Sequence, residues 1–480
     1  MSRGQVGRSR FLILVGIGLV LVLALSLGRR NVAQSAAPLE LLESLPQDAA
    51  MQVFFNQSQA TLYTEPDRGY ERLGDNLEQV VVDAILSAQR SVDVAVQELR
   101  LPRIAQALRD RQRAGVRVRV ILENNYNQPA SQVSPTAIAR LTDRERSRFN
   151  ENLRQIDQNQ DGVLSPAEIT ENDALVVLAD ARIPLIDDRA DGSKGSGLMH
   201  HKFVIVDQQR VVTGSANFTT SDMHGDFSRP STRGNANHIV QIQSPMMAAL
   251  FREEFDLMWG DGPGGRSDSL FGLQKPYRAP RQVRFADNSR LVLQFSPTSR
   301  SRAWAESGNG LIAQALAQAR LQIDLALFVF SEQPLSPVLN TRHQQGISIR
   351  ALIDRGFVFR SYSEALDMLG LALPNLQCGF DEGNAPWERA IATVGFPVLP
   401  EGDLLHHKFA VIDQYRVITG SQNWSAAANY NNDETVLVID NTTVAAHFQR
   451  EFERLYQLAD LGIPAWFPAK VQQELQRCSL

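Results

Sequence analysis

The sequence is short of cysteine, and it is close to electrically balanced. Cys378 and Cys478 are the only cysteines in 480 residues, which excludes a cysteine-ligated metal cluster and a disulfide framework. The two can still form a single bridge in an oxidising compartment, and the sequence leaves that open. The net charge of −5 gives no sign of a general binder of polyanions. With 43% hydrophobic residues, the chain has the composition of a globular protein of two or three domains, or of one large duplicated domain.

The N-terminus carries a long run without charged residues, FLILVGIGLVLVLALSLG (11–28), with arginines on both sides. Its length fits a membrane-spanning helix of about 17–25 residues. A cleaved signal peptide with its cleavage site in 33–37 is the alternative. The run is long for a signal peptide, so we favour an uncleaved anchor over residues 1–30. Both interpretations place the rest of the chain outside the cytoplasm, in the periplasm or at the cell surface, either membrane-anchored or secreted.

The rest of the chain contains an internal repeat. AILSAQRSVDVAVQEL (84–99) is similar to ALAQARLQIDLALFVF (315–330), and HHKFVIVDQQRVVTGSANFT (200–219) is similar to HHKFAVIDQYRVITGSQNWS (406–425). Between these landmarks the first copy is longer by about 25 residues. A duplicated chain of this kind predicts two related halves that form one pseudo-symmetric unit.

Each half alternates short β-rich runs with segments of helical periodicity. This pattern predicts an α/β fold in which helices cover mixed, largely parallel sheets. The expected organisation is a first half over 53–260 with an insert at about 143–172, a linker over 261–284, a second half over 285–460, and a C-terminal tail over 461–480.

The extra residues of the first half contain DQNQDGVLSPAE (157–168), with oxygen-bearing side chains at alternate positions. Gly162 suits the sharp turn of an EF-hand calcium loop, and a glutamate at the twelfth position closes such a loop. A polar surface turn is the alternative interpretation. We expect a structural calcium ion of weak affinity, held by Asp157, Asn159, Asp161, the Val163 carbonyl, Ser165 and Glu168.

The stretches MHHKFVIVD (199–207) and LHHKFAVID (405–413) concentrate scarce residues. They hold two of the chain's five lysines and four of its 8 histidines. Residues two apart in a strand share a face, so each stretch presents one imidazole and one ammonium together: His200 with Lys202, and His406 with Lys408. The neighbouring His201 and His407 fall on the opposite face, where we expect them to pack in the core.

A Gly-Ser-x-Asn sequence follows each stretch after a turn and a second strand. Its serine and asparagine can donate hydrogen bonds to an anion: Ser215 and Asn217 in the first half, Ser421 and Asn423 in the second. Two histidines and two lysines brought together suit a phosphodiester. The lysines grip the non-bridging oxygens, one histidine attacks phosphorus, and the other protonates the leaving oxygen.

Asp207 and Asp413 end the two stretches. Seven residues of extended strand span about 23 Å, so neither aspartate can reach the histidine of its own stretch. Pseudo-symmetry predicts a crossed pairing, with Asp207 beside His406 and Asp413 beside His200.

The pattern HxKxxxxD followed by Gly-Ser-x-Asn, present twice, resembles the phospholipase D superfamily, and most closely its nuclease and cardiolipin-hydrolase-like branch. The resemblance covers most of residues 53–460 apart from the insert. It implies a two-step phosphodiesterase that works through a phosphohistidine, without a catalytic metal, in a monomeric catalytic unit. It also favours His200 as nucleophile and His406 as acid. Members often carry an acidic residue on the strand after Gly-Ser-x-Asn; Glu434 fits, but Asn237 stands at that position in the first half.

The sequence leaves the substrate open. The anchor holds the site near a membrane and favours phospholipid. Nucleic acid is the alternative, since the arginine-rich segment 100–119 can contact phosphates, although a solvated helix followed by a buried strand explains that segment as well. A non-catalytic phosphate-binding scaffold is a weaker alternative, which the two complete motifs oppose.

Overall fold

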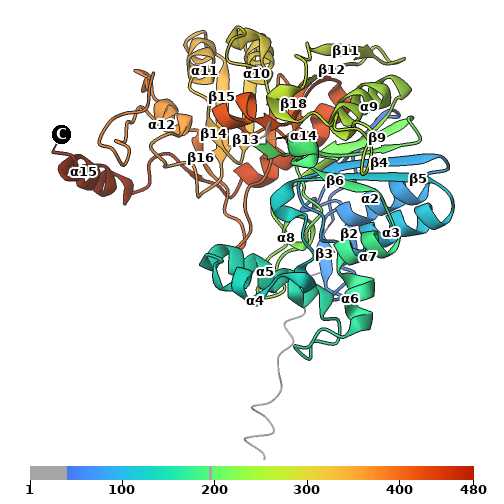
Figure 1. Cartoon of the computed structure of the whole chain (residues 1–480). Coiled ribbons are helices and arrows are strands. Elements are labelled where there is room, and N and C mark those ends of the chain that lie inside the picture. The colour runs from blue at the N-terminus through green and yellow to red at the C-terminus, as the bar shows by residue number, and fades with distance from the viewer. Residues whose placement is uncertain (1–40, 194–196, 480) are drawn as a thin grey trace, which may run out of the picture. The chain divides into compact units, whose positions relative to one another are not determined.

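The computed structural model describes residues 41–193 and 197–479. The predicted membrane anchor over residues 1–30 lies outside these ranges. Within them, no helix is both long enough and apolar enough to cross a membrane. Residues 43–480 form one compact unit, so both repeated halves belong to it (Figure 1).

The first half is built on a seven-stranded sheet of order β1-β10-β9-β8-β4-β5-β6. Strand β4 is parallel to β5, which is parallel to β6, and the other neighbours are antiparallel. Its strands are β1 Met51–Phe55, β4 Ser91–Val96, β5 Arg117–Leu122, β6 Leu185–Asp187, β8 Lys202–Val206, β9 Arg210–Gly214 and β10 His238–Gln243.

The second half repeats this plan in a nine-stranded sheet of order β11-β12-β21-β18-β17-β13-β15-β16-β22. The parallel pairs again involve three adjacent strands: β13 is parallel to β15, and β15 is parallel to β16. Its strands are β11 Arg281–Arg284, β12 Arg290–Phe295, β13 Gln322–Leu327, β15 Ser348–Ile353, β16 Val394–Phe396, β17 Lys408–Ile412, β18 Arg416–Gly420, β21 Thr435–Asp440 and β22 Asp460–Leu461.

The prediction of mixed sheets is confirmed, but the prediction that they are largely parallel is wrong. Within the two large sheets, only the β4–β5–β6 and β13–β15–β16 sets are parallel, and helical crossovers join the strands of these sets. The motif strands β8–β9 and β17–β18 form tight hairpins, whose turns at Asp207–Gln208 and Asp413–Gln414 adopt positive φ. A tight hairpin makes the two strands antiparallel.

Three further strand pairs connect loops: β2 Leu62–Thr64 with β3 Glu71–Leu73, β14 Phe330–Ser331 with β19 Trp424–Ser425, and β7 Leu198–Met199 with β20 Asn432–Asp433. The last pair joins the two halves and lies directly beside the histidines considered below.

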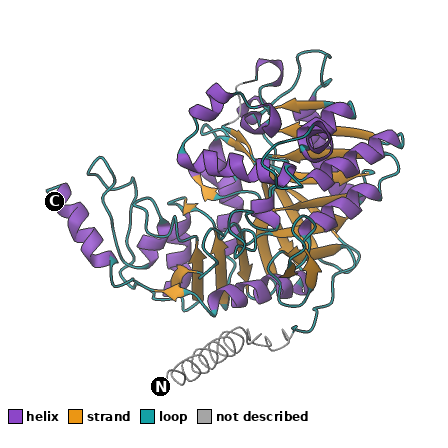
Figure 2. Ribbon diagram, turned by 90° about the horizontal axis from the view of Figure 1, so that it is seen from below, coloured by secondary structure: helices purple, strands orange, loops and turns teal. Residues whose placement is uncertain are grey.

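Helices cover the sheets, as Figure 2 shows by the purple helices around the orange strands. The first half contains α2 Leu77–Leu86, α3 Pro102–Arg113, α4 Pro135–Ala139, α5 Asp143–Ile156, α6 Pro166–Asn172, α7 Ala174–Asp180, α8 Thr220–Met223 and α9 Pro245–Trp259. The second contains α10 Gly308–Leu316, α11 Leu335–Gln344, α12 Glu364–Met368, α13 Ala426–Tyr430, α14 Thr442–Tyr456 and α15 Phe467–Arg477.

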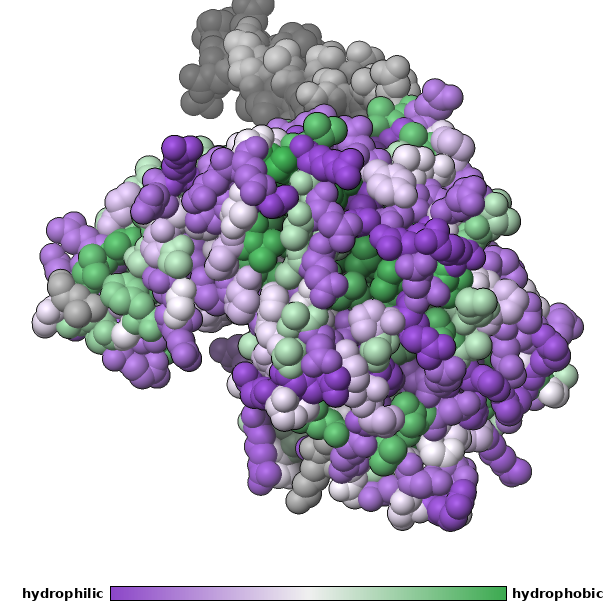
Figure 3. Space-filling view, turned by 90° about the horizontal axis from the view of Figure 1, so that it is seen from above, coloured by the Kyte–Doolittle hydropathy of each residue, from purple (hydrophilic) through white to green (hydrophobic). Residues whose placement is uncertain are grey.

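One hydrophobic cluster runs through both halves. It joins residues of the first sheet and α9, such as Phe203 and Phe251, to residues of the second sheet and α14, such as Phe409 and Phe448. On the face drawn in Figure 3, hydrophobic residues lie in small groups among hydrophilic ones. Burial of apolar area stabilises a fold by about 25 cal/mol per Å², so this shared cluster contributes to holding the halves together.

The two cysteines form a disulfide. Cys378, in the loop between α12 and β16, is bonded to Cys478 at the end of α15, with their Cα atoms 5.2 Å apart. The segment expected to be a tail is therefore a helix tied to the second half.

Candidate active site

The two HxK segments meet where the halves interlock. His200 follows β7, and its backbone N–H donates to the carbonyl of Asp433 in β20 at 3.0 Å. His406 mirrors it: its N–H donates to the carbonyl of Ala236 at 3.1 Å, beside a bridge between Ala236 and Leu405. Each histidine is thus held by the other half. His200 is held by the segment just before β21, and His406 by the segment just before β10.

The side-chain partners cross between the halves in the same way. Nδ1 of His200 lies 2.7 Å from Oε2 of Glu434, which also accepts a hydrogen bond from the Ser421 hydroxyl at 2.6 Å. The carboxylate is fully buried. This arrangement leaves Nε2 of His200 as the nitrogen free to react.

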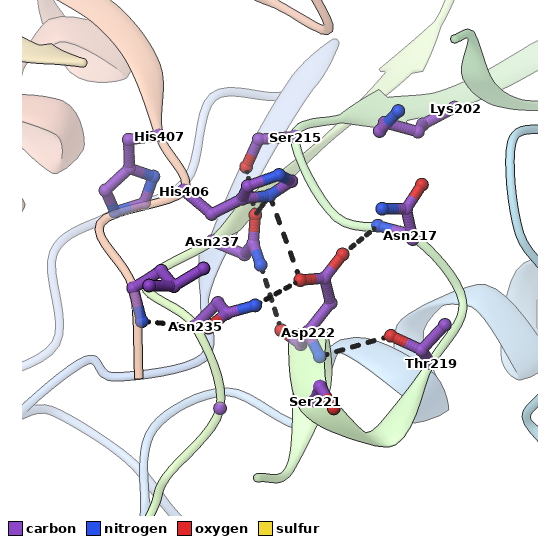
Figure 4. Close-up of polar contacts among 12 residues, drawn as sticks. Lys202, Ser215, Asn217, Thr219, Ser221, Asp222, Asn235, Asn237, His406 and His407 are labelled. Carbon is purple, nitrogen blue, oxygen red and sulfur yellow. Dashed lines mark hydrogen bonds and ion pairs between the residues drawn. The ribbon is translucent and has the colours of Figure 1, made fainter. Parts of the chain in front are cut away.

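His406 has a neutral partner in the equivalent position (Figure 4). Its Nδ1 lies 3.0 Å from Oδ1 of Asn237, and Ser215 Oγ donates to the same oxygen at 2.7 Å. Because Oδ1 only accepts, Nδ1 of His406 carries the proton. The nearest carboxylate oxygen, Oδ1 of Asp222, is 3.8 Å away. The site is therefore pseudo-symmetric in shape and asymmetric in charge.

The two motif lysines are buried at the starts of β8 and β17. Nζ of Lys202 donates to the His200 carbonyl at 2.8 Å and to Gln97 at 3.3 Å. Nζ of Lys408 donates to the His406 carbonyl and lies 5.1 Å from the centre of the Phe328 ring. No carboxylate in the described part of the chain forms an ion pair with either ammonium. Two buried cations without an anion make a site for an anionic ligand.

The electrostatics of the four groups are mutually dependent. Burial first, and then the two ammonium groups, hold the pKa values of His200 and His406 well below their usual range. Burial lowers the pKa of Lys202 to about 8, and burial together with Lys202 lowers that of Lys408. Burial raises the pKa of Glu434 to about 7, against the attraction of Lys202. A bound phosphodiester anion would favour the charged lysines and the protonation of a histidine.

The motif asparagine of the first half lies near the same space. Asn217 donates its backbone N–H to Oδ2 of Asp222 at 2.8 Å (Figure 4). The side-chain oxygens of Asn217 and Asn423 are buried and have no hydrogen-bond partner among the described residues. A polar group in that state indicates a partner that binds from outside the chain.

The predicted crossed pairing of the aspartates is wrong. Asp207 accepts backbone N–H groups of Gln89, Arg90 and Ser91 at 2.7–2.9 Å, and Asp413 does the same with residues 320–322 at 2.8–3.0 Å. Both therefore fix the turn before β4 or β13, at the far end of the motif strands. A direct catalytic role for either aspartate is excluded, and the crossing between halves is made by Glu434 and Asn237 instead.

Asp207→Ala should weaken the fold and spare the chemistry. Three N–H groups lose a charged acceptor, so we expect a loss of about 1–2 kcal/mol in the free energy of unfolding. The hydrogen bonds lower the pKa of Asp207 although burial opposes them. A lowered pKa stabilises the protein above the unfolded value near 3.8 and ceases to do so as the pH falls through the folded value. Denaturant unfolding should therefore show a larger difference between the variant and wild type at pH 7 than at pH 3.

The second histidine of each stretch is a core residue, as predicted. His201 and His407 are fully buried, and each lies beside a glutamate, Glu254 at 3.3 Å and Glu451 at 2.9 Å. They stabilise the interface between the halves from the side opposite the site.

The predicted calcium loop lies between α5 and α6. Gly162 has φ +79° and donates its N–H to Asp157, whose other oxygen is buried without a partner in the described chain. The Glu168 carboxylate folds over the loop and accepts from Asn159 N and Ser165. No group of three or more His, Cys, Asp or Glu side chains in the described ranges is disposed as a metal site. The orphaned Asp157 oxygen fits a cation, and calcium stays a prediction.

Two contributors to the site carry no motif signal. Asp222 supports His406 and Asn217 from α8, and Phe328 packs its ring against His406 at 4.9 Å. Thr219 caps α8 by accepting from the Asp222 N–H, and nothing in the sequence indicated that the fold turns the Asp222 carboxylate toward a histidine of the other half.

The chain is similar to known proteins over both repeated halves. The family model described as "Cardiolipin synthase, PLD-like domain" matches residues 81–259 and 312–456. Mouse mitochondrial cardiolipin hydrolase is 32% identical over 168 residues, which are 35% of this chain and 66% of that protein. A phospholipase D of Rickettsia felis is 26% identical over 137 residues, 28% of this chain and 58% of its own length. The matches thus span less than two thirds of these relatives.

A solved structure shares the architecture at greater length. The phosphatidylserine synthase of Haemophilus influenzae aligns with a TM-score of 0.53 and 12% identity, over 91% of this chain and 94% of that one. At this identity the likeness concerns the fold alone.

Proposed function

The chain belongs to the family of PLD-like domains and is a phosphodiesterase, and we propose that it hydrolyses a phospholipid through a phosphohistidine. The observation that carries the proposal is the crossed site, in which two histidines with free Nε2 atoms stand among two buried, unpaired lysines. The cardiolipin hydrolases among its relatives support a phospholipid substrate.

In the first step Nε2 of His200 attacks phosphorus, and the bond to the leaving alcohol oxygen breaks. His406, protonated at Nε2 once the phosphate anion is bound, gives that proton to the leaving oxygen. Phosphorylation puts positive charge on the His200 imidazole, which the Glu434 carboxylate compensates. Lys202 and Lys408 hold the non-bridging oxygens, on which negative charge builds up.

The second step uses the same two histidines in the same positions. Neutral His406 takes a proton from a water molecule, the hydroxyl attacks phosphorus, and the bond to His200 Nε2 breaks. Because Asn237 is neutral, it orients His406 without holding its proton as a carboxylate would. The amide partner therefore suits the residue that must give a proton and take one.

Vesicles of defined composition test the substrate. Protein should release the headgroup alcohol from phosphatidylethanolamine, phosphatidylglycerol or cardiolipin at least about tenfold faster than it nicks single-stranded DNA at equal phosphodiester concentration. The generic diester bis(p-nitrophenyl) phosphate shows whether the site is active at all. Faster cleavage of DNA than of every lipid would assign the chain to nucleic acid instead.

We also propose a calcium ion in the loop of residues 157–168, as a structural clip. The residues named above would hold it, and calcium loops of extracellular proteins have dissociation constants of about 10⁻⁴–10⁻³ M. Adding 10 mM calcium should then raise the melting temperature by about 2 °C or more. Magnesium should do less, and Glu168→Gln should abolish the shift without changing cleavage of the generic diester. An equal shift in that variant contradicts the proposal.

The location that we propose is outside the cytoplasm, at a membrane. The disulfide between Cys378 and Cys478 supports it, because such bonds persist in oxidising compartments. The uncharged run at 11–28 would serve as the anchor.

A further inference from the structure

A lysine outside the two HxK stretches is completely buried. Lys275 belongs to the segment between α9 and β11, where the sequence predicted a linker, and its side chain has no exposed surface. A buried ammonium is costly unless carboxylates pair with it. The partners of Lys275 therefore show which parts of the fold it holds.

The Lys275 ammonium joins the two halves. Its Nζ donates to Oε1 of Glu254 in α9 and forms an ion pair with Oδ1 of Asp433 in β20 at 2.5 Å. Both carboxylates are buried, and Nε of Arg278 lies 3.0 Å from the other oxygen of Glu254. Two cations thus balance two anions. We call Glu254, Lys275, Arg278 and Asp433 the linker clamp.

The linker clamp holds the strand that orients His200. The Asp433 carbonyl accepts the backbone N–H of His200 at 3.0 Å, and the next residue, Glu434, lies 2.7 Å from the His200 imidazole. The Asp433 side chain is fixed from two directions, because the Gly272 N–H also donates to its Oδ1, at 2.9 Å. A displacement of Asp433 would therefore move both groups that orient His200.

The other carboxylate of the linker clamp reaches the motif stretch itself. Oε1 of Glu254, which accepts from Lys275, also lies 3.3 Å from Nε2 of His201. Nδ1 of His201 is in turn 3.0 Å from the hydroxyl of Thr435. The ammonium is thus connected through one carboxylate to the residue that follows His200, and through the other to the residue that precedes the glutamate partner of His200.

The corresponding position beside the other catalytic histidine differs. The N–H of His406 donates to the Ala236 carbonyl at 3.1 Å, so Ala236 occupies the place that Asp433 has in the other half, and it carries no carboxylate. The next residue, Asn237, is held by a neutral partner, since its N–H donates to the Asn56 amide at 2.9 Å. Hydrogen bonds between neutral groups are weaker than those with a charged partner. The linker clamp therefore distinguishes the two histidines.

We propose that Lys275 is a positioning residue for His200, because it fixes the segment that supplies both the backbone acceptor and the carboxylate partner of this histidine. Its effect on the reaction rests on the proposed function, whereas its effect on the geometry of His200 does not. A displacement of 1 Å at a reacting group can lower the rate by about 10²-fold. The two motif lysines, which bind the phosphate, lie outside the linker clamp, so binding should change little.

Kinetics of the full chain with bis(p-nitrophenyl) phosphate test the catalytic effect, well below the melting temperature of each variant. Lys275→Met should lower kcat by about 10²-fold and leave KM within about threefold of wild type. Arg416→Met is the matched control. It breaks another buried ion pair, with Asp440 at the far end of β18 and β21, and should lower the melting temperature without lowering kcat.

Two results overturn the proposal: an equal loss of kcat in Arg416→Met, or no loss in Lys275→Met. If Lys275→Met does not fold, Asp433→Asn takes its place, because it keeps an acceptor for Gly272 and removes one charge of the linker clamp. This variant should lower kcat by about tenfold, and an unchanged kcat overturns the proposal in the same way.

Proton NMR on the same proteins separates geometry from activity. The Nδ1–H of His200 that is bonded to Glu434 should give a far-downfield signal, identified by its absence from Glu434→Gln. This signal should shift or broaden in Lys275→Met and stay in place in Arg416→Met. An unchanged signal in Lys275→Met overturns the positioning role. Failure of wild type to cleave bis(p-nitrophenyl) phosphate rejects the proposed function alone, since the signal still reports on His200.

Discussion

His200→Ala should abolish hydrolysis of every phosphodiester, whereas His406→Ala should still complete the first half of the reaction on an activated substrate. In the proposed mechanism His200 forms the covalent bond to phosphorus, so without it no intermediate exists. p-Nitrophenolate leaves without a proton, so an enzyme without His406 can still be phosphorylated. Steady-state turnover of bis(p-nitrophenyl) phosphate should fall by more than about 10³-fold in both variants.

Rapid mixing distinguishes the two. His406→Ala should release about one p-nitrophenolate per active site and then stop, with the p-nitrophenyl phosphoryl group still bound to the protein after a quench at high pH, where a phosphohistidine is stable. His200→Ala should show neither burst nor label. His343, which stacks on Trp387 with ring centres 5.7 Å apart, lies outside the site, and His343→Ala should behave as wild type. A burst in His200→Ala and none in His406→Ala would reverse the two roles.

Replacing Glu434 by glutamine should produce the second largest effect and change the pH dependence. The carboxylate compensates the charge that His200 acquires, and an amide does not, so we expect kcat to fall by about 10²-fold. Glutamine keeps the size of the side chain and a hydrogen-bond acceptor, so the fold should be retained. Melting temperatures of the two proteins provide that control.

The sign of the pH effect follows from the raised pKa of Glu434, about 7. As the pH falls through this value the carboxylate is protonated and can no longer compensate His200, so kcat/KM of wild type should fall on the acid side of pH 7. In Glu434→Gln this decline should be absent, because nothing at that position titrates. The histidine and the carboxylate titrate as a pair, so the pH profile gives the value for the pair. An unchanged acid limb in the variant would assign it to another group.

The composition of the site could be predicted from the sequence, because the repeat and the strand period alone place His200 with Lys202 and His406 with Lys408. The packing of His201 and His407 followed from the same alternation. The position of Glu434 was visible as a difference between the halves, NDETV (432–436) against NANHI (235–239).

The connections between the halves could not be predicted. In the sequence, Asp207 and Asp413 are close to the motif histidines. In the structure, a five-residue strand lies between each aspartate and the histidine of its own stretch, and each aspartate sits in a turn at positive φ where it accepts from backbone N–H groups. Asp222 reaches His406 because Ala236 bridges to Leu405 across the halves, and Phe328 reaches it because β13 pairs with β17 within the second half. Strand direction was misjudged for a related reason: helical crossovers are obvious in a sequence, and they join only a few of these strands.

The pairing of β7 with β20 also links catalysis to completion of folding. Each histidine has its backbone hydrogen-bond partner and its side-chain partner in the other half. A half that folds alone therefore has a histidine whose tautomer is not fixed and only one of the two lysines of the site. Activity therefore requires the contacts between the halves. A partly unfolded chain lacks the complete site, and enzymatic activity reports native docking more sharply than secondary structure does.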